Sequence, residues 1–524
     1  MPVASARMGP MIFVSLTVEI LRSRPAIVFW FAALAQAALW TLVPAIFYSA
    51  PPGDLPETLA VGREFQLGTY LGPPLAFWLA ELAFRVGGMT GVYALSQACV
   101  VVAYWAVFAL GRAIVGERHA ALAVLLMVGI AAFTVPTPDF GPAMLALPLW
   151  ALALLHYWRA VGEGQRRYWL LAALDIGLLL LTTYAGLVLF GLVLVFTLAS
   201  ERGRASLNAI DPWIAAIIVI VVLFPHLLWL ESDGDALLPT LARLHSAQAA
   251  DQNLFALLRL AAAFLLAHAG LALLVAIAFH WGSARRADAP EIVRKSVDPF
   301  ARQFVLFFAF APALAATIIA VLAGRATPVG GTGPLLVLSG LALIVAAPDR
   351  IGLNRQGLLN FAWASLLIAP PALAAIAVVM LPRTLAVDVR AAQPAQAMGQ
   401  FFAENFQRRT GHPLAIVAGD PRIAALVALG AQSRPSVYLD ATPERSPWVS
   451  AKDVLQKGAV VVWPADDTAG TPPPAIRQRF PDLVPELPHG FARGVQGRMP
   501  LMRIGWGVIR PQEAAPPAPA PAGR

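Results

Sequence analysis

The sequence predicts a polytopic α-helical membrane protein with a small C-terminal α/β domain on its outer side. Of the 524 residues 58% are hydrophobic and only 13% are charged, whereas a soluble domain carries about 25% charged residues. Long apolar runs recur as far as about residue 383. Beyond residue 384 the charge rises and short β-like runs replace the long ones. The chain is therefore long enough for a membrane domain and one further domain.

The distribution of basic residues indicates a lipid bilayer, and not nucleic acid, as the partner of this chain. The formal net charge is +8, but Lys and Arg gather in the short loops between apolar runs, which is the pattern that sets membrane topology. The one cysteine, Cys99, lies inside an apolar run. It excludes an intramolecular disulfide and a cysteine metal cluster.

Residues 1–24 form the first predicted segment. Their apolar residues recur at helical spacing, and Arg22 and Arg24 stand at the end. This pattern is typical of a cytoplasmic amphipathic helix that lies in the membrane interface. No small-residue cleavage site follows a short apolar core, so we expect no cleaved signal peptide.

The membrane domain is predicted over residues 25–383. A span needs about 20 apolar residues, fewer where it is buried among neighbours, and this rule yields about eleven spans. Their approximate ranges are 25–48, 91–114, 119–135, 142–159, 168–183, 185–200, 212–231, 254–280, 303–324, 333–348 and 359–382.

The predicted orientation follows from the loops. With the N-terminus in the cytoplasm, about 17 Lys and Arg lie inside and about 5 outside. An odd number of spans then places the C-terminal domain outside, which in a bacterial inner membrane is the periplasm. The same outer face receives the loop 49–90, the loop around Asp139 and the loop 232–253.

The loop 49–90 is too long for a simple connection. Its first part contains Asp54, Glu57, Arg63 and Glu64. Its second part, PPLAFWLAELAFRVGG, is apolar but shorter than a span, which indicates a re-entrant or interfacial helix ended by the glycine pair 87–88. Two interpretations stay open, an active-site loop at the membrane surface and an ordinary solvated connection.

The outer domain is predicted over residues 384–510. Strands are expected at 413–419, 435–440 and 458–464, with helices at 401–411 and 421–432 between them. The turn after the first strand lacks the G-x-G-x-x-G pattern, so no dinucleotide site is expected. The Pro/Ala-rich tail 511–524 is expected to be disordered.

The candidate catalytic residues are mainly acids that are predicted on the outer face. Asp54 and Glu57 lie in the first loop and Asp139 in the second, and carboxyl groups at a membrane–water boundary suit general acid–base catalysis. For Asp139 the alternative is a helix N-cap before the next span. No Cys/His cluster indicates a metal, and no cofactor is expected.

Three further polar residues lie in or beside predicted spans. Asp175 is a functional candidate because it is intramembrane, although pairing with an Arg or a backbone donor is the alternative. His268 can simply hydrogen-bond across the bundle. His226 is expected near the outer face, together with Trp229 and Glu231. Glu231, with Asp233 and His245 in the following loop, is a candidate for the acceptor side.

A set of spaced residues resembles bacterial glycosyltransferase family 39, a GT-C family related to protein O-mannosyltransferases and the lipid A aminoarabinose transferase. The first outer loop reads Asp54, then Tyr70-Leu71-Gly72-Pro73-Pro74-Leu75, then Trp78. Asp139 follows in the next outer loop, and Asp175-Ile-Gly-Leu precedes Thr183-Tyr184. The resemblance covers residues 25–250 and implies a GT-C membrane fold.

This resemblance implies an inverting transfer of sugar from a polyprenyl-phosphate donor to a lipid, glycan or protein acceptor at the outer membrane face. Asp54 would be the general base and Asp139 a second catalytic acid. The implied substrate-binding residues are Glu57, Arg63, Tyr70, Pro73, Pro74, Tyr184, His226 and Arg243.

The chain departs from the family pattern at three places. Leu55 stands where an acid is common, Gly72 where the family has histidine, and Thr183 where it has lysine. These departures place the contacts to the donor phosphate in doubt. A lipid-like substrate transporter or flippase and a non-catalytic envelope scaffold therefore remain alternatives.

Overall fold

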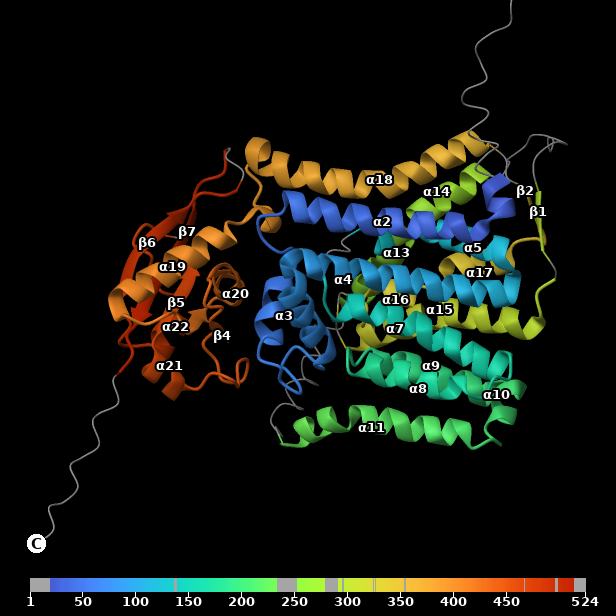
Figure 1. Ribbon diagram of the computed structural model, residues 1–524, viewed down its shortest axis with the longest axis horizontal. Helices are drawn as coiled ribbons and strands as arrows, with labels where there is room; N and C mark the ends of the chain where they lie inside the picture. Colours follow the sequence, from blue (N-terminus) through green and yellow to red (C-terminus); the bar gives the residue numbers. More distant parts are fainter. Residues whose placement is uncertain are drawn as a thin grey trace, which may run out of the picture. The chain divides into compact units, whose positions relative to one another are not determined.

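The computed structural model describes residues 19–135, 139–232, 252–278, 291–294, 296–323, 325, 327–352, 355–465, 467–494 and 498–512. The chain divides into two compact units, both drawn in Figure 1. The first unit consists of the residues up to Ile46 and of Leu71–Ala375. The second unit consists of Phe47–Tyr70 and of the residues from Ile376 onward. Most of the predicted N-terminal helix, the tail beyond residue 512, Asp233, Arg243 and His245 lie outside the described residues.

The first unit is a bundle of helices (Figure 1). The long helix α4 packs against α5 and α7, and α8 packs against α7 and α11. A short antiparallel pair, β1 (Glu291–Val293) and β2 (Arg350–Gly352), joins two of its connections. Its helices are α2 (Pro25–Phe47), α4 (Leu75–Val115), α5 (Glu117–Met127), α6 (Ala131–Thr134), α7 (Pro142–Tyr157), α8 (Tyr168–Leu180), α9 (Gly186–Ala199), α10 (Glu201–Ser206), α11 (Asp211–Ser232), α13 (Gln252–Ala267), α14 (Ala269–Ala278), α15 (Pro299–Leu322), α16 (Thr332–Leu335), α17 (Ser339–Ala346) and α18 (Gln356–Met380).

The chain is a polytopic membrane protein, as predicted. Among the described residues six helices are long and apolar enough to cross a membrane, or seven if the bent pair Leu257–Ala267 and Ala269–Ala278 is one span. The predicted spans 168–183, 185–200 and 333–348 are shorter apolar helices. The count of about eleven spans is therefore not confirmed.

The glycine pair of the outer loop interrupts α4 where the sequence predicted a break. Gly87 and Gly88 have non-helical backbone angles, and Gly88 has a φ of 59°. Since this left-handed region favours glycine, the pair separates the apolar helix that starts at Leu75 from the following membrane helix.

The second unit is built around a five-stranded sheet. The strands are β3 (Ile416–Gly419), β4 (Ser436–Leu439), β5 (Ala459–Pro464), β6 (Pro485–Phe491) and β7 (Met502–Ile509), in the order β4-β3-β5-β7-β6. β3 is parallel to β4 and β5, whereas β7 is antiparallel to both β5 and β6. The helices are α3 (Leu55–Gly62), α19 (Ala395–Thr410), α20 (Pro421–Gly430), α21 (Ala451–Lys457) and α22 (Pro474–Arg479).

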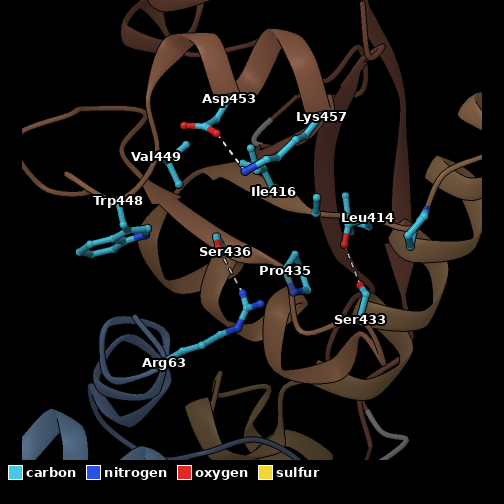
Figure 2. A pocket seen from close by; sticks show the side chains of 12 residues that line it. Arg63, Leu414, Ile416, Ser433, Pro435, Ser436, Trp448, Val449, Asp453 and Lys457 are labelled. Atoms are coloured by element: carbon cyan, nitrogen blue, oxygen red, sulfur yellow. Dashed lines mark hydrogen bonds and ion pairs between the residues drawn. The ribbon is translucent and has the colours of Figure 1, made fainter. Parts of the chain in front are cut away.

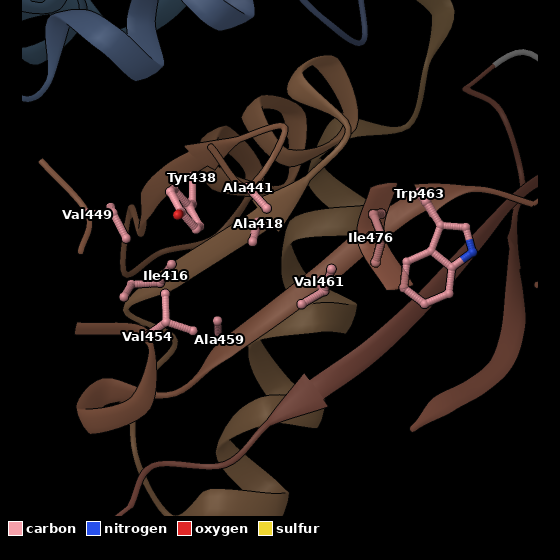
Figure 3. Packing of buried hydrophobic residues seen from close by; sticks show 10 residues of the cluster. All are labelled: Ile416, Ala418, Tyr438, Ala441, Val449, Val454, Ala459, Val461, Trp463 and Ile476. Atoms are coloured by element: carbon pink, nitrogen blue, oxygen red, sulfur yellow. The ribbon is translucent and has the colours of Figure 1, made fainter. Parts of the chain in front are cut away.

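Both faces of this sheet are covered. Successive strand residues point to opposite faces, so Ile416 and Ala418 pack with Tyr438, Val461 and Trp463 on one face (Figure 3). Residues from α21 and α22 close that cluster. α20 packs on the sheet, and α19 packs on α20. This is a doubly wound arrangement, with β3 between its two parallel neighbours.

The contact between α19 and α20 depends on two glycines. A Cβ added to Gly399 would lie 2.0 Å from the carbonyl carbon of Gly430. We expect Gly399→Ala to destabilise the second unit by about 1–3 kcal/mol, the usual cost of overpacking a core. Limited proteolysis of the purified chain would detect faster cleavage beyond residue 395. The matched change Gln400→Ala, at the next and exposed position, should leave the pattern unchanged, and equal behaviour of the two variants would contradict the prediction.

Candidate active site

The carboxylate of Asp54 stands directly ahead of α3. Gly53 makes the turn with a φ of 51°, and Pro56 lies in the first turn of the helix, where its missing N–H costs nothing. Asp54 occupies the N-cap position but makes no side-chain capping bond. Its exposed side chain lies 3.8 Å from the guanidinium of Arg390. The carboxylate is therefore not engaged by the helix it precedes.

The loop before α3 is held to the carboxyl-end side of the parallel strands. Arg422, at the start of α20, donates from Nη1 to the carbonyl oxygen of Gly53 at 2.6 Å. Its Nε donates to Gln393 and its Nη2 to the carbonyl of Arg390. In doubly wound sheets this edge is where ligands bind. Arg422 thus joins three chain segments immediately beside Asp54.

Arg422 is half-buried, and its surroundings are rich in charge. Burial lowers its pKa, followed by the charge of Arg390, whereas Asp54 and Glu57 act in the opposite direction. Each of the three guanidinium nitrogens of Arg422 donates to a carbonyl or amide oxygen, and these hydrogen bonds fix the side chain.

Glu57 has an environment unlike that of Asp54, although it lies only one helical turn away. Burial raises the pKa of Glu57, and Asp54 and Asp420 raise it further, while Arg445 and Arg422 oppose them. Two neighbouring carboxyl groups in different environments are a recurrent arrangement for acid–base chemistry.

Tyr70, the last residue of the first segment of this unit, contacts another arginine. Arg445 donates to the Tyr70 hydroxyl at 3.2 Å, and its guanidinium stacks over the ring at 4.6 Å from the centroid. Arg445 also forms an ion pair with Asp440. Asp440 and Ala441 have φ values of 50° and 53°, a strained conformation for residues with a Cβ. Strain of this kind concentrates at functional sites.

The other candidates belong to the first unit. The Leu75 N–H, directly after the Pro73–Pro74 pair, donates to the carbonyl of Leu181 at 3.0 Å. Three residues further on, the Tyr184 hydroxyl lies 3.0 Å from Nε2 of His226. The His226 ring is buried and stacks on Trp229, with centroids 5.7 Å apart. The structure therefore brings Tyr184 and His226 together.

Two predicted alternatives are wrong. Asp139 is not the N-cap of the next helix, because α7 begins at Pro142 with Gly141 at the cap. Among the described residues Asp175 pairs with neither an arginine nor a backbone donor, but lies 2.6 Å from Nδ1 of His156 on α7. His268 does bond across the bundle, with Nε2 3.0 Å from the Ser339 hydroxyl.

The sequence did not reveal Arg390, Arg422 and Arg445 as partners of the outer loop. They follow it by more than 300 residues, so no local spacing could have predicted the contact. Within the described ranges no three His, Cys, Asp or Glu side chains are placed to hold a metal ion.

Comparisons with known proteins agree with this architecture. Residues 72–229 match the family model described as dolichyl-phosphate-mannose-protein mannosyltransferase. The chain is similar to the crystal structure of ArnT from Cupriavidus metallidurans bound to undecaprenyl phosphate, with 14% identity, a TM-score of 0.57 and coverage of 94% of this chain and 99% of that one. The apo structure of the same ArnT gives 14% identity, a TM-score of 0.55 and the same coverage. No curated protein matches the sequence.

The family model covers the segment from Gly72 to Trp229, which contains the Pro73–Pro74 pair, Asp139, Tyr184 and His226. The structural similarity extends over nearly the whole length of both chains. The chain therefore has the fold of the GT-C glycosyltransferases, as the sequence resemblance predicted, and residues 72–229 carry the pattern of their dolichyl-phosphate-mannose-protein mannosyltransferase family.

Proposed function

We propose that this protein transfers a sugar from a polyprenyl-phosphate donor to a lipid, glycan or protein acceptor at the outer face of the bacterial inner membrane. The observation that carries the proposal is the near full-length similarity to ArnT, whose structure holds undecaprenyl phosphate. The family model adds a description that names dolichyl-phosphate-mannose. The Lys/Arg asymmetry of the loops supports a cytoplasmic N-terminus and a periplasmic outer domain over residues 384–510.

The proposed reaction is a single displacement. The Asp54 carboxylate takes the proton of the acceptor hydroxyl, and the acceptor oxygen forms a bond to the anomeric carbon. The bond between that carbon and the phosphate oxygen breaks, and its electron pair leaves with the polyprenyl phosphate. Attack opposite the leaving group inverts the anomeric carbon. A positioned base of this kind contributes about 10²–10⁴-fold to the rate.

The surroundings of Asp54 favour it as the base. Its carboxylate is exposed and free of a capping bond, whereas Arg390 and Arg422 supply positive charge and a fixed backbone beside it. Glu57 is half-buried, and burial raises its pKa. We assign it a role in substrate binding and not in proton transfer. Asp139 remains the second proposed catalytic acid.

The function is tested by incubating the purified full-length protein with lipid-linked sugars extracted from bacterial membranes. Mass spectrometry would follow the release of polyprenyl phosphate and the mass gained by the acceptor. Wild-type turnover that is lost in Asp54→Asn supports the transferase. No turnover of any lipid-linked sugar by the wild-type protein would overturn it and favour a transporter or a scaffold.

The Glu57 carboxyl group predicts a pH-dependent stability. Because its folded-state pKa is raised above the ordinary value of 4.5, the unfolded chain releases its proton first, so folded wild-type protein loses stability as the pH rises through that window. Glu57→Gln does not titrate, and its melting temperature relative to wild type should rise from pH 4.5 upward. Thermal unfolding in detergent at several pH values measures this difference.

The control is Glu404→Gln, at an exposed position of α19. Its melting temperature relative to wild type should stay constant over the same pH range. A constant difference for Glu57→Gln would contradict the raised pKa.

A further inference from the structure

A cavity of about 350 Å³ opens in the second unit (Figure 2). Its lining includes the first residues of β3 and β4, so it lies at the amino ends of these strands, whereas the Asp54 cluster lies at their carboxyl ends. All of its lining residues belong to this one unit. Its volume is within the range of small-ligand sites, about 300–1,000 Å³. The six lining residues that matter for the following argument are Arg63, Ser433, Ser436, Trp448, Asp453 and Lys457.

Hydrogen-bond donors and acceptors stand on several sides of the cavity. Nη1 of Arg63 donates to the Ser436 hydroxyl at 3.2 Å. Lys457 and Asp453, one turn apart on α21, form an ion pair at 2.9 Å. The Ser433 hydroxyl is fixed by a bond to the carbonyl of Leu414 at 2.8 Å. These fixed partners give the cavity a defined orientation of donors and acceptors, as Figure 2 shows.

The charges of this lining are mixed. Hydrogen bonds from Ser450, followed by that of Lys457, lower the pKa of Asp453 to about 2, so its carboxylate stays an acceptor. Arg63 and Lys457 remain donors, because neither guanidinium nor ammonium has an acceptor atom. The lining therefore offers two charged donors and one charged acceptor, which suits groups that both donate and accept.

Trp448 supplies an aromatic wall to the same cavity. Its Nε1 donates to the carbonyl of Val437 at 3.0 Å, which fixes the ring while the side chain remains partly exposed. The rest of the lining is largely apolar, including Ile416, Pro435 and Val449. A flat apolar ring beside several polar groups suits a ligand with one apolar face and a polar rim.

We propose that this cavity binds a saccharide unit of the acceptor, whose hydroxyl groups bond to Arg63, Asp453 and Lys457 and whose ring stacks on Trp448. Hydroxyl groups both donate and accept, so a sugar satisfies the mixed lining better than a phosphate or a carboxylate does. That the bound sugar belongs to an acceptor rests on the proposed function. That the cavity binds a sugar at all does not depend on it.

Helix α3 relates this cavity to the proposed base. Arg63 follows the last residue of α3 and Asp54 precedes the first, so the two positions are separated by about 13 Å at a rise of about 1.5 Å per residue. An acceptor glycan of a few sugar units held at Arg63 would reach the Asp54 end of the helix. The cavity therefore favours a glycan among the acceptor classes.

The test is saturation-transfer-difference NMR of the full-length protein in detergent, with glucose, mannose, galactose, glucosamine and glucuronic acid as separate probes. At least one sugar should bind to wild type, and Trp448→Ala and Lys457→Gln should each raise its dissociation constant about tenfold. Lys452→Gln, at an exposed position on the same helix but outside the cavity lining, is the matched control and should bind as wild type does.

Two results would overturn the proposal. One is that no sugar binds in a manner sensitive to both Trp448 and Lys457. The other is that inorganic phosphate competes as strongly as the best sugar, which would make the cavity an anion site.

Asp54→Asn separates this inference from the transferase proposal, because it should keep sugar binding while losing transfer. Transfer without sugar binding would refute only the cavity assignment, and sugar binding without transfer only the catalytic one.

Discussion

Asp54→Asn should reduce sugar transfer by about 10²–10⁴-fold, the contribution of a positioned general base. The change keeps the size and shape of the side chain and removes its negative charge together with its capacity to take a proton. Since the Asp54 side chain is exposed and makes no capping bond, the amide should leave the second unit folded. The reduction should appear in kcat, with the KM for the lipid-linked donor almost unchanged.

Asp482→Asn provides the matched control, because Asp482 is an exposed acid of the same unit. It should transfer sugar at the wild-type rate. Both variants should show the same thermal unfolding and the same proteolytic pattern as wild type. If Asp54→Asn retains transfer within a few-fold of wild type, the base lies elsewhere, and the assignment of Asp54 fails even if the protein is a transferase.

The sequence predicted the class of fold because hydrophobicity alone decides which segments enter a bilayer. The same argument predicted about eleven spans, a count that is not confirmed, since apolar runs such as 168–183 and 333–348 form helices shorter than the six or seven candidate spans of the described residues. In a bundle a buried short helix and a membrane span have the same composition. Length in the folded structure, and not hydropathy, separates the two.

In the second unit the predicted strands 413–419, 435–440 and 458–464 contain β3, β4 and β5. These strands are apolar runs buried on both faces, which a sequence displays clearly. β6 and β7 were missed. β6 contains Pro485 and Pro488, and β7 contains Gly505 and Gly507, residues that weaken strand signals. They are tolerated here because β6 is an edge strand and because Gly505 leaves room for the Trp463 indole.

The candidate site shows the same division between local and distant information. Asp54, Glu57 and Tyr70 could be selected from one loop because their spacing is local. The arginines that surround them come from the C-terminal part of the chain. Residues 71–375, which separate the two segments, belong to the first unit and carry no sequence signal of the contact between them. A single sequence therefore predicts the candidate acids, but not the arginines that hold their loop in place.

Arg422→Ala should lower kcat by about 10–100-fold, the loss expected when a support of a catalytic group is removed, although Arg422 itself takes no proton. The substitution deletes the hydrogen bond to the Gly53 carbonyl and those to Gln393 and Arg390. The turn that carries Asp54 then loses its anchor. We therefore classify Arg422 as a positioning residue for the proposed base.

A pH profile distinguishes this role from general stability. Arg422 opposes the raised pKa of Glu57, so its removal should raise that pKa further. The difference in melting temperature that Glu57→Gln produces should then set in at higher pH when it is made together with Arg422→Ala than when it is made in wild type. Arg422→Lys restores the charge but not the forked hydrogen bonds, so it should restore the wild-type onset and only part of kcat. Arg477→Ala, at an exposed position of α22, should change neither quantity. An onset that does not move with Arg422→Ala, together with a kcat loss that follows the fraction of unfolded protein, would make Arg422 a structural residue only.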